Sequence, residues 1–582
     1  MKKLHIVFLL AAGLLIAAYF FVRFYLQADI RHSRNNARDS ASAQNADSTL
    51  DLRPLFIAKI QQLVSKGSKG LYSIAINNMD IDMLKSRVTL TKVQLHHDSS
   101  VLAALDSLKM APDDVFIASF DTLKIVGINL DDVLTQKAID FSEIRLVSPV
   151  IEAYHTKRPY SAAKTVDSIT LFDRIMKDMK SIAIGKLVIE NGTFISHNKT
   201  KKNKKNVLKT VELEMTDILI DSTTEHATDR FLFARQASLA LRNYEMRTAD
   251  DIYFLRIGLL TVRAPQKTMT IDNLSFASQY NQQQFQKKHT RQKEQYDFSA
   301  PKITLHNIDW WSFMQQDRFV ADELVMHNAK LKIRLDRSLP RPLSKMGNFP
   351  QQVVMKLPIR IDVGVMKIRN LDLLYQEYNP ISTQTGSIHL DRLNLDISNI
   401  TNIPSQIKKK KQTVATGTAL FKDIPVKARF VFDLVNHKKG RFSASLTTGS
   451  FEGKKMNDIA QPLGLLKIEK GYVTEFNIAM QGDEHHASGK IMMLYNDFKI
   501  ALYEKEKDEK GLDKKGLLGF FANAFVIKND NPSKNEISRN PAAEFQRDPQ
   551  AGFFNLVWKT ALTGILKTIG ANPSMAENKA KR

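Results

Sequence analysis

The stretch from Ile184 to Phe194, IGKLVIENGTF, carries the pattern on which most of the chain is built. Leu187 and Ile189 stand two residues apart, which is the period of a half-buried β-strand. The pair Asn191-Gly192 follows them and is typical of a turn. The stretch therefore predicts a strand with one apolar face that ends at a turn.

The same pattern recurs: an apolar residue, two others, a second apolar residue, one other, and a third apolar residue. Most copies are followed by a turn-forming residue. Their central apolar residues are Ile144, Leu187, Leu260, Ile303, Leu324, Met366 and Leu393. The spacing is irregular but often close to one or two units of roughly twenty residues, shorter than most repeat families. Repetition of a strand-and-return unit is the favoured interpretation, although any large antiparallel β protein produces similar runs.

Composition limits the classes of function. The chain has 582 residues, a net charge of +23 and no cysteine, so disulfides, thiolate metal sites and cysteine catalysis are excluded. A basic chain can bind nucleic acid or lie near an anionic membrane surface. No nucleic-acid-binding module is recognisable. We therefore expect a membrane neighbourhood and no nucleic-acid partner.

Residues 1–26 predict an N-terminal transmembrane anchor. Positive residues at the start precede an uncharged stretch from Ile6 to Val22, long enough for a helix that roughly spans a bilayer. A signal peptide is the alternative, but bulky aromatic residues and Arg23 follow where a small-residue cleavage site would stand. Lys2 and Lys3 favour a cytoplasmic N-terminus. The bulk of the chain would then lie outside the cytoplasm.

The rest of the chain divides by composition. Residues 27–50 predict a polar linker, 51–410 a helix followed by the repeating strands, and 411–528 a β region with longer alternating strands. Residues 529–550 predict a polar connection, 551–572 an amphipathic helix, and 573–582 a basic tail. The polar stretch Asn281–Gln295 predicts a long loop or local disorder.

The amphipathic helix could pack against the sheet, or it could touch a membrane or a partner protein; the sequence favours neither. Its candidate contact residues are Phe553, Phe554, Val557, Trp558, Leu562 and Ile565.

Motifs for catalysis are missing. There is no phosphate loop, zinc-protease motif, nucleophile elbow or calcium loop, so we expect neither an enzyme nor a cofactor. Asp483-Glu484-His485-His486 contains metal-ligand types, but neighbouring strand residues point to opposite faces. A hairpin tip is the favoured interpretation of this segment, and no metal site is predicted.

Many strands with one apolar face need that face covered. The few helices are too short to do so, and some two dozen strands are expected. The fold class predicted is mainly β: a long, twisted antiparallel sheet curled into an elongated apolar groove behind the transmembrane helix, with few helices and a C-terminal amphipathic helix. A closed β-sandwich is the conservative alternative. The residues expected to line the groove are Ile144, Leu146, Leu187, Ile189, Leu260, Val262, Ile303, Leu305, Leu324, Met326, Met366, Ile368, Leu393 and Leu395.

The N-terminal anchor, the helix and strands at 52–95, the segments FSEIRLVSPVIEAY (141–154) and IGKLVIENGTF (184–194), and the closing strands at 471–502 resemble AsmA-like proteins. These belong to the repeating β-groove, bridge-like lipid-transfer superfamily. The resemblance covers most of residues 1–502 as a pattern, plus the terminal helix. It implies a Gram-negative inner-membrane anchor, a periplasmic β-groove and no catalytic residues. The chain is short for a bridge that spans the envelope alone.

The expected function is therefore to bind phospholipid acyl chains in the groove. The protein would support lipid transport between inner and outer membranes, or outer-membrane assembly. Its expected partners are phospholipids, the inner membrane through the N-terminal helix, and the outer membrane or an envelope protein through the C-terminal helix. The alternative is a non-catalytic structural or scaffolding β-sandwich protein of the cell envelope.

Overall fold

The computed structural model describes residues 53–571 apart from 83, 128–137, 157, 159, 161–180, 199–203, 225, 226, 228, 229, 232, 249, 317 and 503–526. The predicted anchor at 1–26, the linker at 27–50 and the basic tail at 573–582 lie outside the described residues. Among the helices that are described, none combines the length and the apolar character needed to cross a bilayer.

The protein is mainly β, as predicted, with 58% strand and 17% helix. Its 22 strands belong to a mixed sheet, so the prediction of a purely antiparallel sheet is wrong. Among the pairings given by the described residues, four are parallel: β4 and β5 with β6, and β12 and β13 with β14. A parallel neighbour requires a connection that crosses from one end of the strands to the other, and the apolar pattern of a strand does not encode that path.

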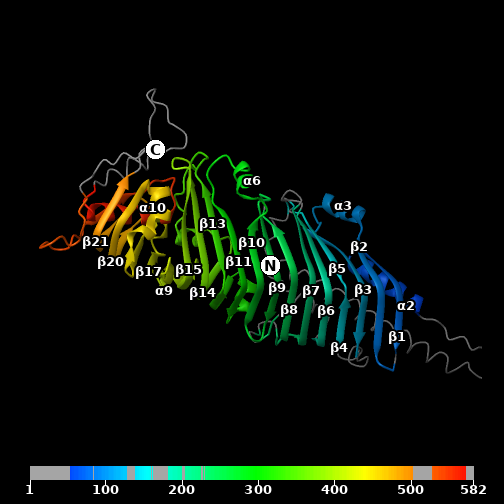
Figure 1. Cartoon of the computed structure of the whole chain (residues 1–582). Coiled ribbons are helices and arrows are strands. Elements are labelled where there is room, and N and C mark those ends of the chain that lie inside the picture. Colours follow the sequence, from blue (N-terminus) through cyan, green and yellow to red (C-terminus); the bar gives the residue numbers. More distant parts are fainter. Residues whose placement is uncertain are drawn as a thin grey trace, which may run out of the picture. The chain divides into compact units, whose positions relative to one another are not determined.

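The chain forms two compact units, which divide within β8, β9 and β10. Figure 1 shows these elements in sequence colours. The first unit contains α2 (Arg53–Gly67), β1 (Tyr72–Asp82), β2 (Arg87–His97), α3 (Ser99–Ser107), β3 (Asp114–Val126), β4 (Ala138–Val147), β5 (Val150–His155), β6 (Ser181–Asn198), β7 (Lys204–Ile220) and most of β8 (Ala234–Arg247). The strand β9 (Tyr253–Arg263) is shared between the units.

The second unit contains most of β10 (Thr268–Ser278) and everything after it. Its helices are α6 (Gln282–Lys287), α7 (Trp310–Gln316), α8 (Pro350–Met355), α9 (Pro404–Lys409), α10 (Asn457–Gly464) and α11 (Phe553–Thr568), with 3₁₀ turns at His437–Lys439 and Gly453–Met456. Its strands are β11 (Gln295–His306), β12 (Arg318–His327), β13 (Lys330–Asp336), β14 (Arg360–Asn379), β15 (Gln384–Thr401), β16 (Gln412–Phe421), β17 (Ile424–Asp433), β18 (Phe442–Thr448), β19 (Phe451–Glu452), β20 (Leu466–Gly482), β21 (His486–Leu502) and β22 (Ala542–Gln546). The hairpin predicted at Asp483–His486 is confirmed as the β20–β21 connection.

One block of strands occurs in both units. In the first, β4 and β5 lie end to end, antiparallel to β3 and parallel to β6. In the second, β12 and β13 lie in the same way between β11 and β14. Equivalent residues stand about 180 positions apart. Repetition by shared architecture is therefore confirmed for this block.

A glycine permits the close parallel approach in each copy. An added Cβ at Gly185 would lie 2.8 Å from the carbonyl oxygen of Ser142, and one at Gly364 would lie 2.6 Å from that of Asp322. Real Cβ atoms do not approach a backbone oxygen so closely. Glycine inside a strand commonly marks such a contact between backbones. The stretch that carries the sequence pattern thus contains the residue that lets β6 meet β4.

The turn-forming residues that follow the pattern do not reverse the chain inside the repeated block. Ser148, Asn191, Asn328 and Asn370 adopt left-handed backbone conformations, with φ between 49° and 58°. Asn191 and Asn370 lie inside β6 and β14, and the pairing of these strands with β7 and β15 shifts register there. Ser148 and Asn328 lie in the short breaks between β4 and β5 and between β12 and β13, which lie end to end. Asn191 and Asn370 therefore stand at bulges, since a short polar side chain tolerates the left-handed conformation in a bulge as well as in a turn. The predicted return at Asn191-Gly192 is therefore wrong.

Candidate functional site

Apolar side chains line up across the strands of the first unit in two adjacent rows. Residues paired in register share one face of a sheet. The first row is Met79, Leu90, Leu123, Leu146, Ile189, Leu213 and Leu239, and the second is Ile81, Val88, Ile125, Ile144, Leu187, Met215 and Ala237. They lie on β1, β2, β3, β4, β6, β7 and β8. One face of this unit therefore carries a continuous apolar stripe.

The second unit carries two rows of the same kind on β11, β12, β14, β15, β16, β17, β18, β20 and β21. The first row is Ile303, Met326, Ile368, Leu395, Gly417, Ala428, Leu446, Ile478 and Ile491. The second is Leu305, Leu324, Met366, Ile397, Ala415, Phe430, Ala444, Met480 and Gly489. We call the face that these two rows occupy the apolar face of the second unit.

The fourteen residues predicted to line a groove lie on strands, and twelve of them belong to these rows or flank them directly. Ten are buried: Ile144, Leu146, Leu187, Ile189, Val262, Ile303, Leu305, Met326, Ile368 and Leu393. The other four, Leu260, Leu324, Met366 and Leu395, are half-buried. Leu260 and Val262 lie on β9, and Leu393 pairs with Leu371 one step beyond the second unit's rows.

Exposure changes along the apolar face of the second unit. Leu324, Met366 and Phe430 are half-buried, whereas Met480 and Ile491 nearer the end of the chain are buried. The helix α11 packs on β21 and β22 and contributes to the burial at this end of the face. In Figure 1 this helix is the red element beside the last strands.

Side-chain contacts place α11 on the apolar face itself. The rings of Phe553 and Phe554 lie 6.0 and 6.3 Å from that of Phe430, a member of the second row. Any Cβ on Gly564 would collide with the Cδ1 atom of Ile491, a member of the first row. The helix therefore covers one end of the rows. Leu324 and Met366, on strands other than those on which α11 packs, are half-buried. Within the described part of the first unit, α2 packs on β1, the first strand of the rows.

Small residues let α11 lie close to the strands. Thr560 and Thr568 are buried, one turn before and one turn after Gly564. Each threonine hydroxyl donates to the carbonyl oxygen four residues earlier in the helix, at 2.8 Å, so no buried hydroxyl lacks a partner here. The helix can thus bury its backbone against the sheet without a polar penalty.

The residues predicted to contact a membrane or a partner are divided by this packing. Phe553 is 5% exposed and belongs to the core of the second unit. Val557, Leu562 and Ile565 are half-buried against the same core. Phe554 is 69% exposed and Trp558 is 44% exposed, so these two aromatic side chains point out of the packed side of the helix.

A buried ion pair holds the chain just before α11. The guanidinium of Arg547 donates to Glu484 Oε1 at 3.1 Å and to the carbonyl oxygens of Lys345 and Ala551 at 2.8 and 3.1 Å. It also lies over the ring of Phe349, 4.4 Å from its centre. Burial lowers the pKa of Arg547, while the hydrogen bond and the charge of Glu484 raise it. Glu484, dismissed as a metal ligand from the sequence, is thus part of this structural pair.

The other end of α11 is held by Tyr495 on β21. This side chain is fully buried, and its hydroxyl donates to the carbonyl oxygen of Lys528 at 2.9 Å or to that of Thr568 at 3.3 Å. Arg539 donates to the same hydroxyl oxygen at 3.1 Å. Burial raises the pKa of Tyr495, against the lowering effect of Arg539. The helix is therefore anchored at both ends.

Sequence reasoning did not bring Asp372, His389 and Asp391 together, because they come from two strands with an irregular register. His389 Nε2 lies 2.7 Å from Asp372 Oδ1 and 3.1 Å from Asp391 Oδ1. About half of each side chain is exposed. Contacts of the imidazole with the two carboxylates account for this arrangement.

Comparison with known proteins adds no family assignment: no family model matches the chain, and no curated protein matches it.

Proposed function

We propose that the protein is a membrane-anchored envelope protein that holds phospholipid acyl chains on its apolar rows and supports lipid transport or outer-membrane assembly. The observation that supports this proposal most directly is the half-buried part of the second unit's rows, at Leu324, Met366 and Phe430. The resemblance to AsmA-like proteins, drawn from the sequence pattern, points to the same function. The anchor at 1–26 and the inner-membrane location belong to the proposal.

Energetics favour an extended apolar ligand on such rows. Each methylene group removed from water contributes about 0.8 kcal/mol. About ten methylene groups laid on the half-buried part of the rows would contribute roughly 8 kcal/mol before the entropic cost of binding. The ligand needs no catalytic group, because binding follows from apolar contact alone.

Photocrosslinking in living cells tests the proposal with two adjacent residues. A benzoylphenylalanine in place of Phe430 would stand on the apolar row, and one in place of Arg429 would stand on the opposite, exposed face of β17. We expect lipid adducts, identified by mass spectrometry of the purified full chain, at position 430 and not at position 429. Equal labelling at both positions, or none at 430 in a folded protein, would refute lipid binding and favour a scaffold with a closed core.

The two aromatic side chains exposed on α11 support a contact with a membrane or an envelope protein as part of the same function. Phe554 borders the half-buried part of the rows through Phe430. A lipid that leaves or enters the rows at this end would pass these aromatic side chains. Crosslinkers at Phe554 and Trp558 would identify the neighbouring molecule, whereas a crosslinker at the adjacent exposed Asn555 serves as the control.

A further inference from the structure

The helix α3 and the residues directly after it carry apolar side chains that the described part of the protein leaves unburied. The helix connects β2 with β3 in the first unit, and none of its residues is buried (Figure 1). Leu108 and Met110 follow it and are 68% and 58% exposed. At 3.6 residues per turn, Val101, Leu105 and Leu108 share one side of the helix. We call Val101, Leu102, Leu105, Leu108 and Met110 the α3 patch.

Hydrogen bonds hold α3 in place at both ends. The Asp98 side chain caps its start by accepting from the backbone N–H groups of Ser100 and Val101 at 2.8 and 3.1 Å. At its end the N–H of Met110 donates to the carbonyl oxygen of Leu105 at 2.8 Å, which returns Met110 to the last helical turn. The α3 patch is therefore presented by a helix with defined ends.

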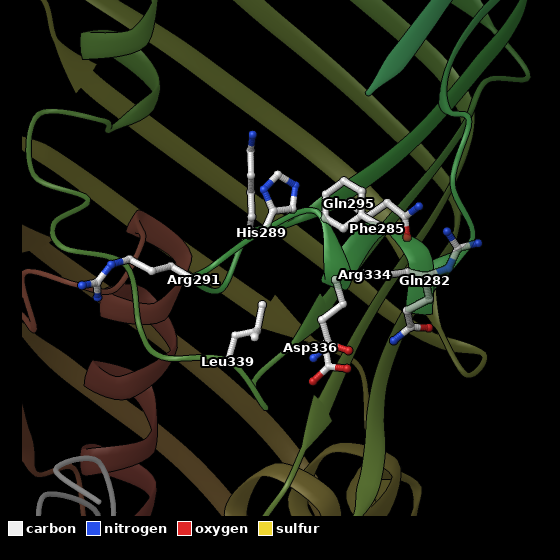
Figure 2. A pocket seen from close by; sticks show the side chains of 10 residues that line it. Gln282, Phe285, His289, Arg291, Gln295, Arg334, Asp336 and Leu339 are labelled. Carbon is white, nitrogen blue, oxygen red and sulfur yellow. The ribbon is translucent and has the colours of Figure 1, made fainter. Parts of the chain in front are cut away.

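The short helix α6 provides a comparison. It lies within Asn281–Gln295, where the sequence predicts a loop or disorder. Its one large apolar residue, Phe285, is 5% exposed and lies against the ring of His289, with ring centres 4.6 Å apart. Figure 2 shows Phe285 beside His289 and Gln295. The helix α3 is longer and has more apolar residues, yet it has no buried anchor of this kind.

Two lysines flank the α3 patch. An added Cβ at Gly70 would lie 4.0 Å from Val101 Cγ2, so the neighbouring Lys69 stands beside the start of the helix. Lys109 stands at its other end, between the two most exposed members of the patch. Both lysines are exposed, and no described carboxylate forms an ion pair with either. Their charges are therefore available to anionic groups outside the protein.

The acids of this segment are engaged within the protein. Asp106 accepts a hydrogen bond from Arg158 Nε at 2.9 Å and another from the Tyr160 hydroxyl. Asp98 is occupied by the helix cap. The lysines, by contrast, have no partner among the described residues. The α3 patch thus combines exposed apolar side chains with free positive charge.

We propose that the α3 patch lies in the interface of the bilayer that holds the N-terminal anchor, with its apolar side chains below the headgroups and Lys69 and Lys109 against anionic phosphates. This inference rests on the proposed function, because the anchor at 1–26 belongs to that proposal. It adds a second contact with the same membrane. The contact would place the ends of β2 and β3, which carry rows of the first unit, beside the bilayer with which lipid exchanges.

A bilayer fits the α3 patch better than a partner protein does. The patch is aliphatic apart from one thioether, whereas the energetically dominant residues of protein interfaces are mostly tryptophan, tyrosine and arginine. Apolar side chains flanked by lysine are typical of helices that lie in a membrane interface. The linker at 27–50 would span roughly 30 Å as a flexible chain, which keeps the first unit close to its anchor.

Lipid-borne quenchers test this contact in the full chain, inserted by its anchor into vesicles of phosphatidylcholine and phosphatidylglycerol. Because the chain has no cysteine, one introduced cysteine carries an environment-sensitive fluorophore at one chosen position. A lipid with a nitroxide near its headgroup should quench the label on Leu108→Cys several-fold more than the label on Leu84→Cys. Leu84 is 99% exposed in the β1–β2 connection, at the other end of β2, which spans roughly 35 Å. A label on Ala103→Cys, on the opposite side of α3, should be quenched less than the label at 108.

A charged variant and a flotation assay separate the outcomes. Met110→Asp places a carboxylate in the patch and should lower quenching at position 108 about five-fold or more, whereas Leu84→Asp should leave it unchanged. Quenching at 108 no stronger than at 84, in chains that float with the vesicles, would overturn the inference and leave the proposed function standing. A label at 108 in apolar surroundings that the lipid does not quench would show a protein contact and overturn it as well. Chains that do not float would contradict the anchor itself, and with it both proposals.

Discussion

Removal of the Arg547 guanidinium should release the helix that covers the apolar face of the second unit. Arg547→Met leaves Glu484 buried without its cation and removes hydrogen bonds to the carbonyl oxygens of Lys345 and Ala551. Both residues are under 9% exposed. Breaking one partner of a buried pair costs about 3–5 kcal/mol. We expect a loss of about 4 kcal/mol in the free energy that holds the α11 segment closed.

Hydrogen exchange measured by mass spectrometry on the full chain would report this loss. A loss of about 4 kcal/mol corresponds to roughly a thousand-fold faster exchange of the α11 amides, at ten-fold per 1.4 kcal/mol. Arg341→Met is the matched control, since Arg341 pairs with Asp548 in the same region but is 40% exposed. That change should cost no more than about 1 kcal/mol.

The double variant Arg547→Met with Glu484→Met sharpens the test. It removes both charges, so no ion is left buried, and it should be more stable than Arg547→Met alone. The difference measures the coupling of the pair. The reasoning fails if Arg547→Met and Arg341→Met accelerate exchange equally, or if the double variant is as unstable as the sum of the two single changes.

Three further predictions concern the packing of single residues. Gly364→Ala places a Cβ 2.6 Å from the carbonyl oxygen of Asp322 and should lower the free energy of unfolding in urea by about 1–3 kcal/mol. Gly464→Ala is the control, because its Cβ would have ordinary contacts at 3.6 Å, and it should lower that free energy by less than half as much. Equal losses would contradict the close parallel approach of the two strands. Phe349→Ala empties a fully buried site between Phe442 and Phe553 and should cost about 3–5 kcal/mol, measured by tryptophan fluorescence; a cost below about 1 kcal/mol would argue against this core. The pKa of Asp98 is lowered chiefly by the hydrogen bond from the Ser100 hydroxyl, and then by those from the backbone N–H groups of Val101 and Ser100. The Asp98 carboxylate therefore stabilises α3 fully above the ordinary carboxyl pKa, and this stabilisation is lost as the pH falls through the lowered pKa. Exchange of the α3 amides should become faster over that pH range, and Asp98→Asn should remove the pH dependence.

The apolar pattern predicted much of what the strands do. Leu187 and Ile189 were expected to share a face, and their register with Ile144 and Leu146 places all four on one stripe. The period of a strand is short and local, so the sequence carries it directly. The period does not determine which strand lies next to which, or whether two neighbouring strands are parallel or antiparallel.

The parallel pairings depend on chain paths that local patterns do not record. Gly185 and Gly364 are the sequence features that indicate these pairings, because the absence of a Cβ lets the backbone of the neighbouring strand approach closely. A glycine before the apolar pair in two copies of the pattern is a signal that could have raised the parallel alternative. The prediction of a turn at Asn191 was wrong because the left-handed backbone conformation occurs both in turns and in bulges.

The helix α6 and the buried ion pair were both missed from the sequence, for different reasons. The start of α6 had a readable signal, since Asn281 and Gln284 stand at capping-box spacing. The pairing of β13 with β11 beside this helix joins residues about forty positions apart, which local patterns do not record. Arg547 and Glu484 are still farther apart in the sequence, and the residues around either one do not predict that the two form an ion pair.

The block of strands that occurs twice has an evolutionary consequence. A chain that carries the same four-strand arrangement at positions about 180 residues apart can arise by duplication of one ancestral segment and can grow by adding further copies. Each added copy would bring its own glycine, its own bulges and its own share of both apolar rows. The length of such a protein then depends on the number of copies. Proteins that descend from one ancestor can therefore differ in the length of their sheet while they keep the same local fold.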